Sequence, residues 1–255
     1  MNRSTGFSEG FLRVTTVLYL MMGVSVASML ALAPVIGLAL GTDLAQTWPA
    51  LVLVAPLAGP AVYGVFGCCR AHGDGSTTVL RDYARAWRAG LRRALPLGVV
   101  AALFGLVIAV DVVALVGQPF GLVALPVVAM MAVVGLLAWL AALAALEEFG
   151  HLKRRDALKA ALVCVIRQPA WSLLSLLGLG TWALVLAGRP VLALGVASGP
   201  VLYLVWANAR HCLRPLRRHL EEAAAGDPGV AGAPAPNRAR RLAPPRVAAT
   251  EGAAR

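Results

Sequence analysis

Asp111 is the one acidic residue that lies well inside a long apolar run of the sequence. An ionised carboxylate in hydrocarbon costs at least about 2.5–3.5 kcal/mol, so its side chain must face water, protein or a counter-ion. Such an acid can carry protons or bind substrate, or it can form a structural pair with a base such as Arg189. We favour a structural pair or exposure at the membrane surface.

Glu147, Glu148 and His151 form the only other cluster of residues with metal-binding chemistry, a single Glu-x-x-His at helical spacing. Di-iron sites in helix bundles need two such motifs and two further carboxylates, and the sequence has no second copy. The phosphate-binding glycine loop, the H-E-x-x-H motif and the G-x-S-x-G motif are also absent. We therefore predict no catalytic residues, no metal and no cofactor.

A Gly-Pro pair followed by a tyrosine occurs twice in similar apolar surroundings, and each copy leads to an arginine. The copies are Gly59, Pro60 and Tyr63 before Arg70, and Gly199, Pro200 and Tyr203 before Arg210. Transporters are often built from repeats in which interrupted helices mark a site near the bilayer midplane. The repetition predicts such a break in each copy. The alternative is that glycine and proline are simply common in membrane helices.

The elements that position these residues are predicted to be membrane-spanning helices. Of the 255 residues, 59% are hydrophobic and 14% are charged, and the mean hydropathy is +0.76. Soluble domains usually carry about 25% charged residues. The apolar runs predict an all-α, polytopic bundle within residues 1–220, with spans at about 14–40, 49–69, 95–116, 121–146, 170–187 and 190–209. Pro34 predicts a kink in the first span, and the fifth is short enough that a re-entrant hairpin stays open.

The basic residues predict how the chain is threaded. Of the 23 lysines and arginines, Arg189 alone lies in a connection that six spans place outside. The positive-inside rule therefore puts both termini in the cytoplasm. A net charge of +11 also fits nucleic-acid binding, but a soluble nucleic-acid-binding domain would not be this apolar. The four cysteines lie near the cytoplasmic ends of spans, where free thiols are expected.

The connection after the second span predicts an amphipathic helix. Leu80, Tyr83, Trp87, Leu91 and Leu95 share one face, and Arg81, Arg85, Arg88 and Arg92 share the other. The aromatic face can lie toward the acyl chains of the bilayer or pack on the protein itself, and the pattern fits both. Residues 223–255, rich in alanine, proline and arginine, predict a disordered cytoplasmic tail.

The chain resembles the YesL-like family of bacterial integral membrane proteins, a family of unknown function. The resemblance rests on the segment GPAVYGVFGCCR, the following RDYARAWRAGLRRAL and the later RRDALKAALVCVIRQP, and covers about residues 11–216. It implies a six-helix protein of the bacterial cytoplasmic membrane. It also implies an accessory or regulatory role in carbohydrate or solute uptake, with a sugar-transport or sensor complex as partner beside the lipid bilayer. The alternative is a stand-alone transporter of small solutes with a midplane site at the Gly-Pro breaks.

Overall fold

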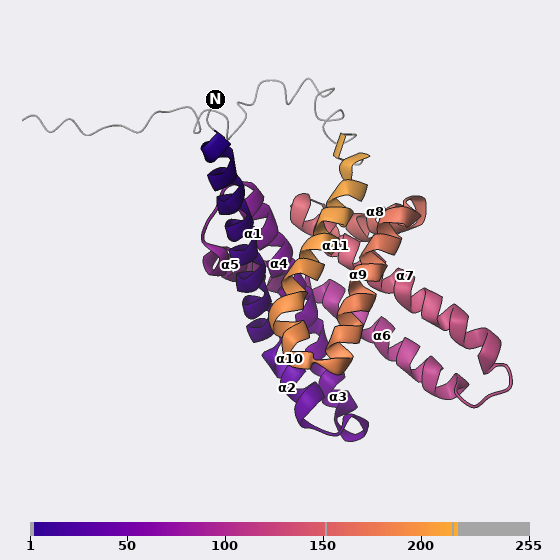
Figure 1. The fold of residues 1–255 in the computed structure, drawn as a ribbon. Coiled ribbons are helices and arrows are strands. Elements are labelled where there is room, and N and C mark those ends of the chain that lie inside the picture. Colours follow the sequence, from indigo (N-terminus) through magenta and orange to yellow (C-terminus); the bar gives the residue numbers. More distant parts are fainter. Residues whose placement is uncertain (1–2, 151, 216, 219–255) are drawn as a thin grey trace, which may run out of the picture. The chain divides into compact units, whose positions relative to one another are not determined.

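The computed structural model describes residues 3–150, 152–215 and 217–218, and in these residues it contains helices and no strands. This confirms the predicted all-α class. The longer helices are α1 (Arg3–Ala31), α2 (Ala33–Gly41), α3 (Leu44–Val54), α4 (Ala58–Gly73), α5 (Val79–Arg93), α6 (Leu95–Leu115), α7 (Gly121–Glu148), α8 (Arg154–Arg167), α9 (Pro169–Gly188) and α11 (Ser198–Cys212) (Figure 1). A 3₁₀ turn over Ala55–Leu57 precedes α4, and the short α10 (Pro190–Leu192) and a π-helical turn over Ala193–Ala197 precede α11.

Five helical segments are long and apolar enough to cross a membrane: Gln46–Gly73, Leu95–Leu115, Gly121–Glu148, Pro169–Gly188 and Pro190–Cys212. A sixth span results if the bent pair Thr15–Ala31 and Ala33–Ala39 is counted as one. The chain is therefore built as a multi-pass membrane protein. The fifth predicted span is a helix of 20 residues, about 30 Å at 1.5 Å per residue, which is enough to cross.

The first span is bent, as Pro34 predicted. The two segments meet at 67°, and Pro34 occupies the first turn of α2. A proline has no backbone N–H and cannot continue the hydrogen-bond ladder of a preceding helix, but it is tolerated in the first turn of a new one. The break therefore falls just before Pro34, at Leu32.

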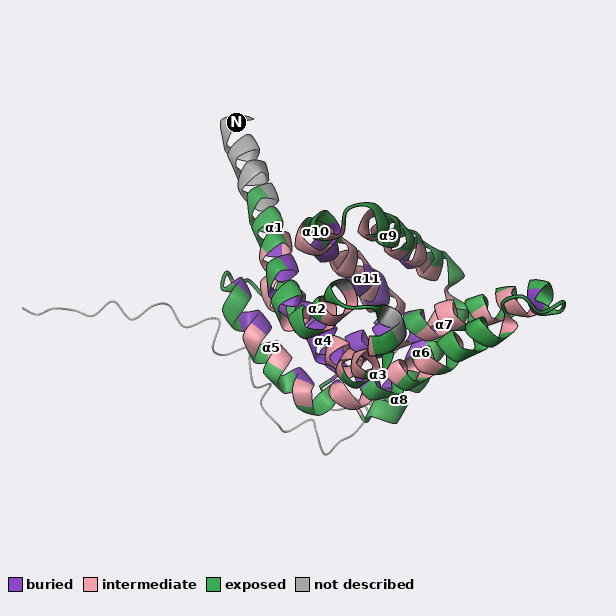
Figure 2. Ribbon diagram, turned by 90° about the horizontal axis from the view of Figure 1, so that it is seen from below, coloured by how far each residue is buried: buried purple, intermediate pink, exposed green. Residues whose placement is uncertain are grey.

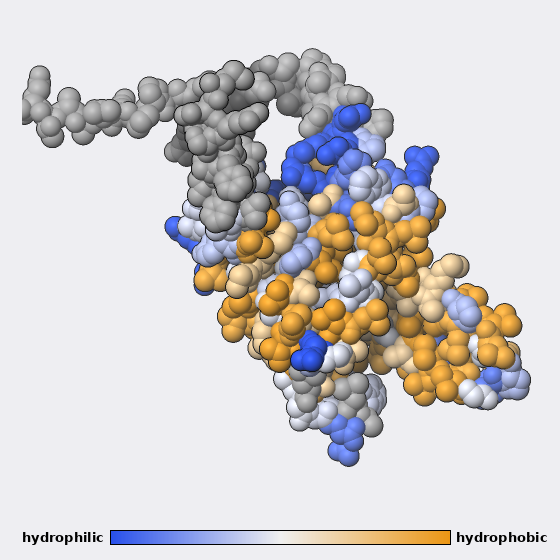
Figure 3. Space-filling view, viewed as in Figure 1, coloured by the Kyte–Doolittle hydropathy of each residue, from blue (hydrophilic) through white to orange (hydrophobic). Residues whose placement is uncertain are grey.

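The buried core lies where α4, the second half of α7, α11 and the middle of α1 meet (Figure 2). Phe66, Leu143 and Leu20 are among its largest fully buried side chains. Helices α6 and α9 instead expose most of their apolar side chains, including Val113 and Leu184. Figure 3 shows a largely apolar surface over the α6–α7 hairpin. Surface of this kind is suited to contact with lipid. The four cysteines are free thiols, and three of them are buried.

Helix α5 packs its aromatic face on α4, which decides between the two environments left open for it. The Tyr83 hydroxyl donates a hydrogen bond to the Ala61 carbonyl at 3.3 Å, and Tyr83 and Trp87 both lie against Gly64. Burial raises the pKa of the Tyr83 phenol, so it stays a neutral donor. Tyr83 is covered by α4 and does not face acyl chains, so that expectation is wrong for Tyr83. Leu80 remains exposed.

Candidate functional site

The first Gly-Pro pair lies where α4 begins beside the junction of α5 and α6. A Cβ atom on Gly59 would lie 2.8 Å from the Ala94 carbonyl oxygen and 3.2 Å from Gly98 Cα. Only a glycine allows the two helices to come this close. Gly59 therefore lies beside the first turn of α6, next to the basic end of α5. The position of this pair relative to the bilayer midplane stays a prediction.

The second Gly-Pro pair lies in the last span, and Ser25 of α1 hydrogen bonds to the backbone groups around it. Pro200 has no N–H, so the Val196 carbonyl four residues earlier loses its usual helical donor. The Ser25 hydroxyl donates to this carbonyl at 3.3 Å and accepts from the Gly199 N–H at 2.8 Å. Ser25 is fully buried, and its hydroxyl thus joins α1 to the last span at the second Gly-Pro pair.

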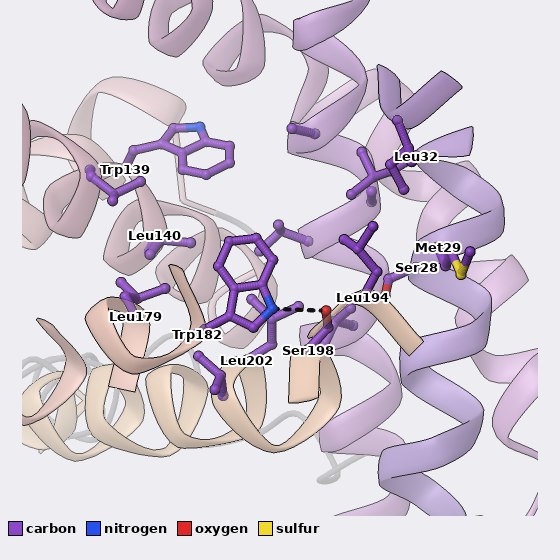
Figure 4. Close-up of a pocket in the computed structure, with 17 residues that line it drawn as sticks. Ser28, Met29, Leu32, Trp139, Leu140, Leu179, Trp182, Leu194, Ser198 and Leu202 are labelled. Atoms are coloured by element: carbon purple, nitrogen blue, oxygen red, sulfur yellow. Dashed lines mark hydrogen bonds between the residues drawn. The ribbon is translucent and has the colours of Figure 1, made fainter. Parts of the chain in front are cut away.

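The π-helical turn before Gly199 is held by two further side chains. The Ser198 hydroxyl donates to the Ala193 carbonyl at 2.9 Å. The Trp182 indole N–H, from α9, lies 3.2 Å from both the Ala193 carbonyl and the Ser198 hydroxyl oxygen (Figure 4). Interruptions of a membrane helix need partners of this kind because lipid offers none. A 3₁₀ turn precedes the first Gly-Pro pair and a π-helical turn precedes the second, each within one helical span.

A cavity of about 250 Å³ lies between the two breaks. Ala58, Ala61 and Val62 line it beside the first pair, and Ser198 and Val201 line it beside the second. Most other lining side chains are leucine, valine, methionine or tryptophan, from α1, α7 and α9 (Figure 4). The Ser28 hydroxyl there donates to the Ser25 carbonyl, while the Trp139 N–H has no hydrogen-bond partner among the described residues. A sugar presents hydroxyls all round that need convergent polar partners, so this cavity suits an apolar ligand.

The two tyrosines of the repeat do not converge on this cavity. Tyr63 is buried against Gly90 of α5. Tyr203 packs against Trp206 of its own helix, with ring centroids 5.7 Å apart. Residues next to both Gly-Pro pairs thus line one cavity, whereas the two tyrosines lie in unrelated contacts.

The arginines that end the two repeats meet at one place, which the sequence analysis missed. Arg70 Nε lies 2.8 Å from Glu147 Oε1, and Arg210 Nε lies 3.4 Å from Glu148 Oε1. Arg70 also donates to the Glu147 carbonyl oxygen at 3.0 Å. Each arginine follows its repeat glycine by eleven residues (59 to 70 and 199 to 210). We name these four residues the double ion pair.

The double ion pair explains the adjacent acids at the end of α7. Each carboxylate is almost fully buried and holds the end of a different helix, α4 or α11. The Arg210 guanidinium also lies 5.2 Å from the Trp206 ring centroid, a cation–π contact. These roles replace the Glu-x-x-His motif as the account of Glu147 and Glu148; His151 lies outside the described residues. Among the described residues, no three metal-ligating side chains of the His, Cys, Asp and Glu types gather.

The remaining predicted residues are exposed. Asp111 is exposed near the end of α6, and no ion pair joins it to Arg189 in the described part of the chain. The described residues thus show no structural pair at Asp111, and its position at the membrane surface stays a prediction. Arg85 and Arg88 lie on the exposed face of α5, and Arg85 is 3.6 Å from Asp82.

Comparison with known proteins gives no identification. No family model, no curated protein and no solved structure matches this chain. Its function must therefore be inferred from the sites themselves.

Proposed function

We propose that this chain is a YesL-like accessory protein of the bacterial cytoplasmic membrane, which assists a solute-uptake complex, with carbohydrate as the expected solute class. The observation that carries the proposal is the exposed arginine face of α5. The opposite face of this helix is fixed on α4 by Tyr83 and by the close approach of Ala86 to Gly67. A rigid helix with one free basic face is suited to dock a partner.

The charges on this face favour an acidic partner. Arg81, Arg85, Arg88 and Arg92 follow one another at intervals of three or four residues, and all four are exposed. Like charges at this spacing repel and destabilise a helix by a few tenths of a kcal/mol per pair, roughly. Asp82 offsets only part of this, since the Arg85 side chain beside it stays 69% exposed. An acidic surface on a partner would relieve the repulsion and steer the association.

The interior also supports an accessory role over transport of a polar solute. The cavity between the breaks has apolar walls, and its serine hydroxyls are already hydrogen bonded. The acids at the end of α7 hold helices together. Neither the cavity lining nor these acids provide the convergent polar groups that the hydroxyls of a sugar need.

Charge reversal on α5 tests this proposal. Arg85→Glu with Arg88→Glu is expected to lower co-purification of the uptake complex from native membranes at least about tenfold, since repulsion replaces attraction. The yield and thermal stability of the variant should stay near wild type, because both side chains are exposed. The measurement is a mild-detergent pull-down with quantification of each accompanying transporter subunit.

Lys159→Glu with Arg167→Glu is the matched control, since it reverses two exposed charges on α8. It should leave the recovered complex unchanged. Equal loss with both variants would indicate non-specific charge effects. Recovery of the wild-type chain alone, under conditions that preserve known complexes, would overturn the accessory role.

The cavity itself favours a second candidate, a stand-alone transporter whose solute is apolar. Such a protein, reconstituted alone in vesicles, should move an apolar fluorescent solute. Pro60→Ala with Pro200→Ala should change the rate several-fold, because restored backbone N–H groups would straighten the broken helices. Uptake equal to that of protein-free vesicles would exclude this candidate.

A further inference from the structure

An apolar groove of about 390 Å³ runs between α6, α7 and α8. Its wall on α6 is formed by Leu97, Ala101, Phe104 and Ile108, which recur every three or four residues. From Leu97 to Ile108 the helix rises about 16 Å. Half the hydrocarbon thickness of a bilayer is about 15 Å, so the groove is as long as one leaflet is deep.

A basic pocket of about 600 Å³ lies where α6 and α8 begin and α7 ends. Arg93, Lys153, Arg154 and Arg155 line it, together with Leu146, Gly150 and Leu152, and no carboxylate from the described residues does. The nearby acids Glu147 and Glu148 are held by Arg70 and Arg210, and Asp156 follows the pocket on α8. The pocket is therefore a concentration of positive charge at the edge of the apolar bundle.

The pocket and the groove are continuous along two helices. Arg93 precedes Leu97 by one turn, and Arg154 precedes Leu158 of the groove by one turn of α8. The Arg154 side chain is fixed there, since it donates to the carbonyls of Arg92 and Arg93 at 2.7 and 3.2 Å. The cations thus lie at the end of the groove where α6 and α8 begin.

We propose that this groove and pocket bind one anionic phospholipid from the leaflet on the basic side of the protein. The phosphate lies among Arg93, Lys153 and Arg155, and an acyl chain fills the groove. Arginine matches the geometry of phosphate oxygens with paired N–H donors, and basic pockets between membrane helices are suited to anionic headgroups. A lipid with a choline headgroup fits poorly because its cation would meet four others.

The headgroup is tested by binding of phosphatidylglycerol and phosphatidylcholine to the purified full chain, counted by native mass spectrometry. The wild type is expected to bind phosphatidylglycerol about tenfold more tightly. Lys153→Ala with Arg155→Ala should reduce this preference to about twofold or less, since two of the three cations placed around the phosphate are lost. Lys159→Ala with Arg167→Ala, which removes the same two charges elsewhere on α8, should leave the preference unchanged. Equal loss in both variants would overturn the proposal.

The groove is tested separately through Gly105, which lines it and has open space where a Cβ would lie. Gly105→Phe is expected to fold normally and to weaken phosphatidylglycerol binding about tenfold by filling the groove. Gly180→Phe is the control, because Gly180 on α9 also faces open space and lies away from the groove. If Gly105→Phe binds like wild type while excess inorganic phosphate displaces the lipid, the pocket is a site for free phosphate and the proposal fails.

Discussion

Replacement of Arg70 by alanine is expected to destabilise the helix bundle by about 3 kcal/mol, the low end of the cost of breaking a buried ion pair. The variant would leave the Glu147 carboxylate without its cation while its side chain is only 2% exposed. It would also remove the donor to the Glu147 carbonyl oxygen. The measurement is the free energy of unfolding, or the melting temperature, of the purified protein in mild detergent.

Arg70 and Glu147 differ in burial, so removing one or the other is expected to have different effects on stability. Glu147→Gln leaves Arg70, whose side chain is 44% exposed and can stay hydrated, so this variant should cost only about 1 kcal/mol. Arg70→Ala with Glu147→Gln should recover most of the stability lost in Arg70→Ala, since no charge is then buried alone. Arg85→Ala is a second control: Asp82 is also largely buried, but its carboxylate keeps the hydrogen bonds that the Ser76 and Thr78 hydroxyls donate. Equal destabilisation by Arg85→Ala and Arg70→Ala would show that loss of the cation that pairs with Glu147 is not the cause.

Gly199→Ala is expected to destabilise the protein by about 2–3 kcal/mol through overpacking. An added Cβ would overlap the Met21 carbonyl oxygen and lie 2.7 Å from the Ser25 hydroxyl. Both neighbours belong to α1, so the methyl group would push α1 away and weaken the hydrogen bonds that Ser25 makes at the break. Thermal unfolding in detergent measures the effect.

Gly180→Ala is the matched control for Gly199→Ala, because a Cβ there meets nothing within 4 Å. It should be neutral or raise stability by up to about 1 kcal/mol, the difference in helix propensity between glycine and alanine. A Gly199→Ala variant as stable as Gly180→Ala would mean that α1 and the last span are not in close contact.

The sequence predicted the helices well because their signals are local. Long apolar runs predict spans whatever surrounds them, and Pro34 and Pro200 break helices for reasons of covalent geometry. The apolar and arginine faces of α5 follow from helical spacing alone. Helical spacing does not show that the apolar face of α5 is covered by α4. That contact depends on Gly64 and Gly67, which leave room for Tyr83, Trp87 and Ala86.

The double ion pair could not be predicted from local pattern, because Arg70 and Glu147 are 77 residues apart. A signal was nevertheless present: two arginines at the same position of a repeat, and two adjacent acids at the end of an apolar run that leads to the same side. The close approach at Gly59 could not be predicted either, because it depends on Ala94 and Gly98, which the repeat does not encode.

The adjacent carboxylates at the end of α7 also bear on how the protein is made. In a chain synthesised from its N-terminus, α4 is made before α7. Arg70 therefore cannot pair with the Glu147 carboxylate until α7 is complete. Arg210 emerges last and meets Glu148 beside a Glu147 that is already paired. The Arg70–Glu147 pair can therefore form before the Arg210–Glu148 pair, which also needs the last span.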